Sequence, residues 1–195
     1  MTPALELLDL AARAATALPL PDIAQAVFPP DRKGDGMQGE FCALRLADGS
    51  IGTAFVLLGD TLAKLQQRAP GKLVGKPALE VARLFVARDP VERALGLAAI
   101  NAITQHVFRR AGYEPDLATN SLGSLRLEPG DRVGMIGYFA PLIERVRAQG
   151  LPLTIVELRA ELVKDEPGLT VTLDPKRLAS CNKIVSTSSV LLNDT

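Results

Sequence analysis

Apolar residues near the N-terminus follow first a helical and then an extended pattern. Between Ala4 and Ala17 they recur near helical spacing, and Pro19 and Pro21 come next, so the pattern predicts a helix that ends before these prolines. Ile23–Phe28 is a short apolar run that stops at two further prolines. This run predicts a brief strand.

Two apolar runs, Glu40–Leu46 and Ile51–Leu58, are joined by a polar turn that contains Asp48-Gly49. Asp-Gly between two such runs is typical of a tight turn, so these residues predict an antiparallel hairpin. The preceding segment, Asp31–Gly39, holds three glycines and several charges. Its composition predicts an open loop of the kind that often covers a site.

Helical spacing dominates the next stretch of the chain. It predicts helices at Leu62–Arg68, Pro77–Ala87 and Asp89–Ala111. The last of these has the clearest ends, because Asp89 suits an N-cap, Pro90 suits the first helical position and Gly112 suits the residue after the helix.

The second half of the chain alternates between strand and helix patterns. Val133–Gly137 is a short apolar run suited to a buried strand, and Pro141 can start a helix that Gly150 ends. Leu153–Leu158 then predicts a second strand. Two strands joined through a helix lie parallel with a right-handed crossover, so the turn after the first strand lies at the edge where open α/β sheets bind ligands.

A change of composition separates these two halves. Tyr113–Gly130 is richer in Pro, Asn, Ser and Gly, and a domain boundary near Asn120 is the natural interpretation. We therefore expect an α/β protein with an α+β domain at residues 1–120 and a parallel-sheet domain at residues 121–195.

Composition restricts the classes of partner. The chain has 22 Lys and Arg against 22 Asp and Glu, so its net charge favours neither nucleic acid nor an acidic membrane surface. No uncharged apolar run is long enough for an ordinary membrane-spanning helix, and 47% of the residues are hydrophobic. We expect a globular, cytoplasmic protein.

Few residues in the sequence could bind a soft metal. Cys42 and Cys181 are far apart and predict two reduced, buried thiols. His106, the single histidine, is expected on a helix surface or an interface. A zinc site built from His and Cys is therefore improbable on composition.

The turn Gly137-Tyr138-Phe139 is the main candidate site. A glycine lets a ligand approach the backbone, and amides at the following helix start can bind an anion. Glu157 lies 20 residues beyond Gly137, where dinucleotide-binding folds often place an acid against a ribose. However, Met135 stands where the first glycine of that fingerprint belongs, which argues against ordinary NAD binding. A packing glycine with a solvated acid is the alternative.

Side chains near this turn carry further expectations. Tyr138 could present its hydroxyl to a ligand, whereas Phe139 is expected in the core. Lys183–Val185 predicts another strand, and the run Ser186–Ser189 after it could bind phosphate, carboxylate or another polar group. The same hydroxyls could instead cap a helix.

Three blocks of the sequence, residues 89–102, 133–141 and 186–195, resemble in order an uncharacterised microbial family described as putative heavy-metal chelation. The resemblance implies a domain similar to the enolase N-terminal domain, then a Rossmann-like domain, with a cleft between them. It also implies a set of ligand-binding residues, namely Asn101, Gly137, Tyr138, Phe139, Glu157, Thr187, Asn193 and Thr195.

This sequence departs from the family pattern in two kinds of feature. Ser188 and Asp194 stand where the family often has a glycine and a smaller or different residue. The patterns above also supply only two or three parallel strands, fewer than a Rossmann-like sheet normally needs. We expect either a truncated domain or a homo-oligomer whose partner chain covers the open sheet edge.

Three functions agree with these patterns. The first is binding or processing of a small polar or anionic ligand in the cleft, which includes a nucleotide-type cofactor-binding enzyme. The second is handling of a metal ion or metal chelate, for which Glu157, Asn193 and Asp194 could serve only a hard ion. The third is a non-catalytic partner-binding module. The sequence identifies no pairing of nucleophile and base, so it leaves open whether the protein is an enzyme.

Overall fold

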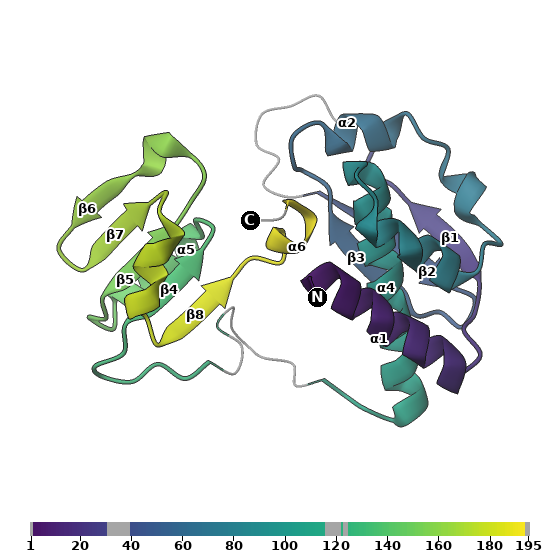
Figure 1. Cartoon of the computed structure of the whole chain (residues 1–195), viewed down its shortest axis with the longest axis horizontal. Coiled ribbons are helices and arrows are strands. Elements are labelled where there is room, and N and C mark those ends of the chain that lie inside the picture. The colour runs from purple at the N-terminus through teal and green to yellow at the C-terminus, as the bar shows by residue number, and fades with distance from the viewer. Residues whose placement is uncertain (1, 31–39, 116–121, 123–124, 194–195) are drawn as a thin grey trace. The chain divides into compact units, whose positions relative to one another are not determined.

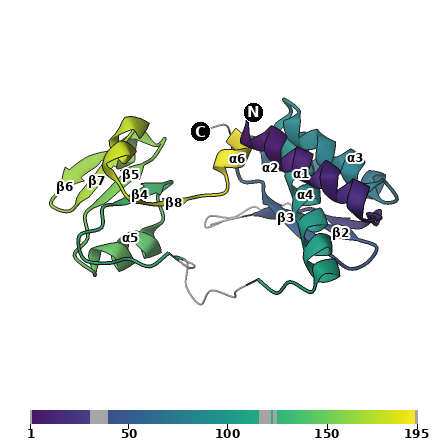
Figure 2. The same ribbon diagram turned by 60° about the horizontal axis from the view of Figure 1, so that its bottom comes forward.

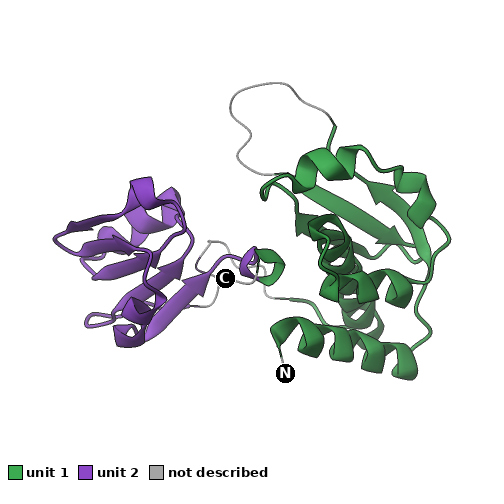
Figure 3. Ribbon diagram, turned by 45° about the horizontal axis from the view of Figure 1, so that its top comes forward, with its two compact units in different colours: residues 1–115, 191–195 green, residues 116–190 purple. Residues whose placement is uncertain are grey.

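The computed structural model describes residues 2–30, 40–115, 122 and 125–193 (Figure 1). The chain divides into two compact units: unit 1 comprises residues 1–115 and 191–195, and unit 2 comprises residues 116–190 (Figure 3). The predicted loop Asp31–Gly39 and the predicted boundary at Asn120 lie outside the described residues. In the part that the structure describes, no helix is long and apolar enough to cross a membrane.

Unit 1 combines an antiparallel sheet with helices. The sheet has the order β1-β2-β3, and β2 and β3 form the predicted hairpin. Its elements are α1 (Pro3–Ala17), β1 (Ile23–Val27), β2 (Phe41–Leu46), β3 (Ile51–Phe55), α2 (Thr61–Gln66), α3 (Ala78–Ala82) and α4 (Pro90–Ala111), with 3-10 turns at Pro70–Leu73 and Arg83–Val86. The predicted third helix, Pro77–Ala87, is therefore α3 continued by a 3-10 turn.

The helix α4 lies against the sheet and forms the centre of unit 1 (Figure 1). As predicted, Asp89 caps its start by accepting a hydrogen bond of 2.8 Å from the Val91 N–H, and Gly112 ends it in the left-handed conformation with φ 64°. Two glycines allow close packing here. A Cβ at Gly52 would lie 2.1 Å from the Ala98 carbonyl oxygen, and one at Gly96 would lie 2.1 Å from the Phe85 nitrogen.

Unit 2 contains a five-stranded sheet of the order β6-β7-β5-β4-β8. Its elements are β4 (Val133–Ile136), α5 (Ala140–Arg147), β5 (Leu153–Val156), β6 (Lys164–Glu166), β7 (Leu169–Thr172) and β8 (Lys183–Ser186), with 3-10 turns at Ala160–Leu162 and Pro175–Ser180. The pairs β7·β5, β5·β4 and β4·β8 are parallel, and only β6 runs antiparallel to its neighbour. The mixed α/β class is thus as predicted.

The expectation of two or three parallel strands is wrong, because β7 makes a fourth. This strand buries only Leu169 and Val171, while its two threonines are half-buried on the other face. Its partner β6 is a polar segment without any apolar run. Neither strand has the continuous apolar pattern that marks a strand buried on both faces.

The two faces of this sheet differ in their cover. Val133, Met135 and Ile155 point into a core that also contains Leu142 and Val146 of α5. The opposite face is covered in part by the 3-10 turn Pro175–Ser180, since a Cβ at Gly134 would lie 2.9 Å from Leu178 Cδ2. Figure 2 shows α5 on one side of the sheet and this turn on the other.

After unit 2 the chain returns to unit 1. The short helix α6 (Val190–Asn193) places Leu192, 8% exposed, in the unit 1 core. The Leu191 carbonyl accepts a hydrogen bond of 3.1 Å from Arg93 Nη2 on α4. Unit 1 is therefore completed by residues from both sides of unit 2 in the sequence.

Candidate functional site

The carboxyl ends of the parallel strands in unit 2 are joined in one row by backbone hydrogen bonds. Thr187 N–H donates to the Ile136 carbonyl at 3.1 Å, Gly137 N–H to the Val156 carbonyl at 2.9 Å, and Glu157 N–H to the Thr172 carbonyl at 3.0 Å. The residues after β8, β4, β5 and β7 consequently stand side by side along this edge. We call this row, residues 137–139, 157–159, 172–174 and 186–189, the carboxyl rim.

The strand order reverses at β4. From β4 the chain moves to β5 and on to β7 on one side, and it then returns to β8 on the other side of β4. At such a reversal the loops after two neighbouring strands run in opposite directions and leave a crevice at their carboxyl ends. In this sheet the loops after β4 and β8 flank the reversal, and they contain Gly137 and Thr187.

The turn after β4 requires a glycine. Gly137 has φ 92°, a conformation that residues with a Cβ rarely adopt. A Cβ there would lie 3.2 Å from Thr187 Cγ2 and 3.3 Å from Phe139 Cε2. The Phe139 ring therefore stands beside Gly137 and Thr187. Phe139 is 38% exposed, so its expected place in the core is wrong: it precedes α5 at the end of the sheet, outside the layer that α5 covers.

Glu157 ties the loops after β4 and β5 together. Its Oε2 accepts from the Tyr138 N–H at 2.9 Å, and its Oε1 accepts from the Leu158 N–H at 2.9 Å and the Arg159 N–H at 3.2 Å. The Arg159 guanidinium lies 3.4 Å from Oε1. With 11% of its side chain exposed, Glu157 is not the solvated acid of the alternative interpretation.

The surroundings of Glu157 keep it ionised. Burial alone would raise the pKa of this carboxyl, but the hydrogen bonds and charge of Arg159, together with the Tyr138 N–H, outweigh burial and lower the pKa below its ordinary value. A carboxylate that accepts several N–H groups fixes the loop geometry. Glu157 therefore holds the Gly137 turn in position.

The hydroxyl groups after β8 form a local cluster. Thr187 Oγ1 lies 3.0 Å from Ser189 Oγ and accepts a hydrogen bond of 3.2 Å from the Ser189 N–H. Ser186 Oγ donates to the Thr187 carbonyl at 3.1 Å. These bonds form a turn before α6 that holds the hydroxyls of Thr187 and Ser189 together, while the Thr187 methyl group lies beside Gly137.

The eight predicted ligand residues fall into two groups. Unit 2 brings together five of them at the carboxyl rim, namely Gly137, Tyr138, Phe139, Glu157 and Thr187. The Tyr138 side chain packs against the unit 2 core. Asn101 and Asn193 belong to unit 1, and Thr195 lies outside the described residues.

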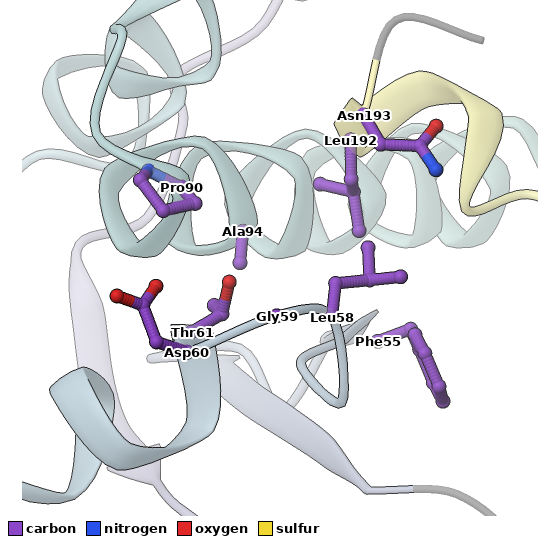
Figure 4. A pocket seen from close by; sticks show the side chains of 9 residues that line it. All are labelled: Phe55, Leu58, Gly59, Asp60, Thr61, Pro90, Ala94, Leu192 and Asn193. Atoms are coloured by element: carbon purple, nitrogen blue, oxygen red, sulfur yellow. The ribbon is translucent and has the colours of Figure 1, made fainter.

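Asn101 has a structural partner in unit 1. Its Nδ2 donates to the Thr53 carbonyl on β3 at 2.8 Å, so this amide satisfies a backbone group of the neighbouring strand. Asn193 lines a pocket of about 290 Å³ together with Leu192 (Figure 4). The pocket is formed by the turn between β3 and α2, the start of α4, and α6, and its polar residues include Asp60 and Thr61.

Two family models, both described as putative heavy-metal chelation, match residues 39–104 and 120–195. The chain belongs to this family. Among curated proteins, no match to the chain is found.

The fold of this family member is similar to two solved structures, each of a protein with unknown function from the DUF364 family. One is from Desulfitobacterium hafniense DCB-2, with 18% identity, a TM-score of 0.61, and coverage of 97% of this chain and 70% of that chain. The other is from Pyrococcus horikoshii, with 20% identity, a TM-score of 0.61, and coverage of 97% and 71%. At these identities the likeness concerns the fold.

The described residues of this heavy-metal chelation family member do not fit a soft-metal site of its own. No group of three or more His, Cys, Asp or Glu side chains lies together within the described residues. His106 is 5% exposed and its Nδ1 lies 2.9 Å from Asp48 Oδ2, so the expectation of a surface or interface histidine is wrong. Its position on α4 faces the hairpin turn, which shields the ring.

The two cysteines are unpaired thiols in different environments. Cys42 is buried, and burial raises its pKa to about 11 against the opposing effect of backbone hydrogen bonds. Such a thiol is a poor metal ligand at neutral pH, because the thiolate is the binding form. Cys181 is half-buried rather than buried as predicted, since it precedes β8 at the end of the sheet.

The sequence patterns do not single out several residues of the carboxyl rim, among them Leu158, Arg159 and Leu173. These three lie in the loops that follow β5 and β7. Recognising β7 would have identified Leu173, because the residue after a parallel strand belongs to the ligand-binding edge. Leu158 was assigned to the strand itself, which ends earlier, at Val156.

Proposed function

We propose that unit 2 binds a small anionic molecule at the carboxyl rim, between the loops that follow β4 and β8. The observation that carries this proposal is the reversal of strand order at β4, with the Gly137 turn on one side and Thr187, at the start of the loop after β8, on the other. Open α/β sheets bind ligands at such a reversal.

The groups at this position suit an anion. The helix α5 starts directly after the Gly137 turn, and among the described residues no side chain caps its first turn. Helix-start amides attract negative charge, and at α5 this role falls to the Ala140 N–H, because Pro141 has no N–H and the Leu142 N–H donates to the Phe139 carbonyl. The Thr187 and Ser189 hydroxyls bond to each other, so one of the two is left to donate a hydrogen bond to the anion. Arg159, 56% exposed, lies on the same rim, where its guanidinium pairs with the Glu157 carboxylate.

The description of the family suggests that the ligand is connected with heavy metals. Because the described Cys, His, Asp and Glu side chains do not cluster, we propose that the metal enters as a complex with an organic chelator. Biological chelators commonly bind metals through carboxylates, and a carboxylate-bearing chelator belongs to the class of ligand that the rim suits. Unit 2 would then recognise the chelator, with or without its metal.

The test is a titration of the full chain by NMR with inorganic phosphate, with citrate, and with citrate plus Zn²⁺. We expect saturable shifts of the Gly137, Tyr138 and Ser189 amides with both anions. Binding should weaken several-fold in Thr187→Val, which keeps the side-chain shape and removes the hydroxyl. Ser180→Ala is the control, because this exposed serine lies at the opposite end of the sheet, before β8.

Two results would contradict the proposal. One is the absence of saturable shifts at the rim with either anion. The other is equal weakening by Thr187→Val and Ser180→Ala, because the effect would then not depend on the crevice. If Zn²⁺ alone were to produce the shifts that citrate plus Zn²⁺ produces, direct metal binding would replace the chelate proposal.

A further inference from the structure

We infer that the ligand of the carboxyl rim carries an apolar group in addition to its anionic group. This apolar group is flat enough to lie across the ends of β4, β5 and β7. This inference rests on the proposed function and names the chemical class of its ligand. Three large apolar residues stand exposed along this part of the rim: Phe139 at 38%, Leu158 at 67% and Leu173 at 51%.

The position of these three residues follows the sheet. Phe139, Leu158 and Leu173 come after β4, β5 and β7, which are neighbours in that order. The large apolar side chains of unit 2 that are exposed in the described residues number five, and the remaining two are Val163 and Ile184. Most of the exposed apolar side chains in this unit therefore share one edge of the sheet, where a single ligand could cover them.

The backbone beneath the three side chains is firmly held. The Glu157 carboxylate accepts hydrogen bonds from the N–H groups of Tyr138 and Leu158, and the Glu157 N–H donates to the Thr172 carbonyl. These bonds connect the loops after β4, β5 and β7 without using any of the three apolar side chains. The apolar row is consequently positioned before a ligand arrives, which lowers the entropy cost of binding.

Polar and apolar groups divide the rim between them. The hydroxyls of Thr187 and Ser189 lie at the β8 end, whereas the exposed apolar residues lie toward β7. Phe139 stands at the junction, because its ring lies next to Gly137, which adjoins Thr187. A ligand that covers both parts has an anionic group over the β4 and β8 loops and an apolar group over Leu158 and Leu173.

The experiment compares two probes that share the anion and differ in the apolar group. Calorimetric titration of the full chain with phenyl phosphate and with methyl phosphate measures the contribution of the ring. We expect phenyl phosphate to bind at least tenfold more tightly, because covering a ring removes a large apolar area from water. Leu158→Ser should remove most of this advantage and leave the affinity for methyl phosphate within twofold of the wild type.

Control variants locate the effect. Ile184→Ser makes a similar change at a residue that is 45% exposed and pairs with Gly134 inside the sheet, two residues before β8 ends, and it should leave both affinities unchanged. Leu173→Ser should repeat the result of Leu158→Ser. Both leucines are at least half exposed, so these variants are expected to fold, which amide spectra check.

The results distinguish failure of the inferred apolar group from failure of the proposed anion site. Equal binding of the two probes, or a loss in Ile184→Ser as large as in Leu158→Ser, overturns the inference that the ligand carries an apolar group, while the proposed anion site is unaffected. Failure of both probes to bind overturns the proposed function, and the inference that rests on it falls too.

Discussion

Asp48 joins the hairpin turn to α4. Its Oδ1 accepts from the Ser50 N–H at 3.0 Å, and its Oδ2 accepts from Ser50 Oγ at 2.8 Å and lies 2.9 Å from His106 Nδ1. Arg109 also donates to the Asp48 carbonyl at 2.8 Å. Burial would raise the pKa of Asp48, but the hydrogen bonds from His106 and Ser50 outweigh it and lower the pKa from 3.8 to about 2.

These contacts predict a loss of stability in acid. A carboxyl whose pKa is lower in the folded chain stabilises the fold fully above its unfolded pKa, and this contribution disappears as the pH falls from about 4 to about 2. Asp48→Asn should reduce the unfolding free energy of unit 1 at neutral pH by about 2 kcal/mol. It should also flatten the decline of that free energy below pH 4.

Urea unfolding at several pH values, followed by amide signals of unit 1, measures this effect. Asp9→Asn, on the exposed surface of α1, serves as the control and should retain the wild-type acid profile. If Asp48→Asn keeps the full wild-type slope between pH 4 and pH 2, the pair with His106 does not provide the acid-sensitive contribution.

A second prediction at the residue scale concerns backbone conformation in unit 2. Gly137 and Gly168 have φ 92° and 79°, so alanine at either position is strained by about 1 kcal/mol. A Cβ at Gly168 would have no neighbour within 4 Å, whereas one at Gly137 would press on Thr187. Gly137→Ala should therefore lower the unfolding free energy of unit 2 more than Gly168→Ala does. Equal losses in urea unfolding would mean that the loops after β4 and β8 are not closely packed.

At the scale of elements, the close contact between α4 and the 3-10 turn before it predicts that alanine at Gly96 destabilises the helix that it would ordinarily stabilise. Within a helix, replacing glycine by alanine ordinarily stabilises by up to about 1 kcal/mol. At Gly96 the new Cβ would lie 2.1 Å from the Phe85 nitrogen, a backbone atom that cannot move alone. Gly96→Ala should instead destabilise unit 1 by at least about 2 kcal/mol.

Gly71 offers the matched control for this substitution. It lies in a 3-10 turn, and a Cβ there would meet nothing within 4 Å. Gly71→Ala should leave the thermal midpoint of unit 1 nearly unchanged. A Gly96→Ala protein as stable as the wild type would show that α4 does not pack closely on residues 84–85.

The sequence predicts elements whose signals are local. Asp89 and Gly112 mark both ends of α4, and Asp48-Gly49 marks the hairpin, because caps and tight turns depend on residues within a few positions of one another. Local signals do not predict the strand pair β6 and β7. The alternation in β7 and the polar residues of β6 can be recognised as strands only once β7 is placed beside β5, and the sequence pattern does not specify this pairing.

The candidate site shows the same division. The Gly137 turn and the hydroxyls after β8 are predictable from strand, glycine and serine patterns. The burial of His106 and the exposure of Phe139 are not, because each depends on which distant segment covers it. The role of Glu157 as the tie between two loops likewise needs the register of β4 against β5.

At the scale of the whole molecule, the buried residues form two separate cores. One core contains buried residues of unit 1 together with Leu192, and the other contains buried residues of unit 2. The two share no buried residue in the part of the chain that the structure describes. Separate cores of this kind can unfold at different denaturant concentrations, so stability is best followed by probes in each unit.

The return of the chain to unit 1 predicts an effect that sequence position would not suggest. Leu192 follows all strands of unit 2, yet it is 8% exposed in the unit 1 core and adjoins Leu191, whose carbonyl is held by Arg93. Leu192→Ala should lower the unfolding free energy of unit 1 by about 2 kcal/mol, at the lower end for a leucine because the neighbouring pocket lets the site relax. Hydrogen exchange of the full chain measures this loss, which should appear in α4 and β3 and spare β4 and β5.

Leu158→Ala is the control, since that leucine is 67% exposed in unit 2. Faster exchange confined to unit 2 in Leu192→Ala would contradict the assignment of α6 to the first core.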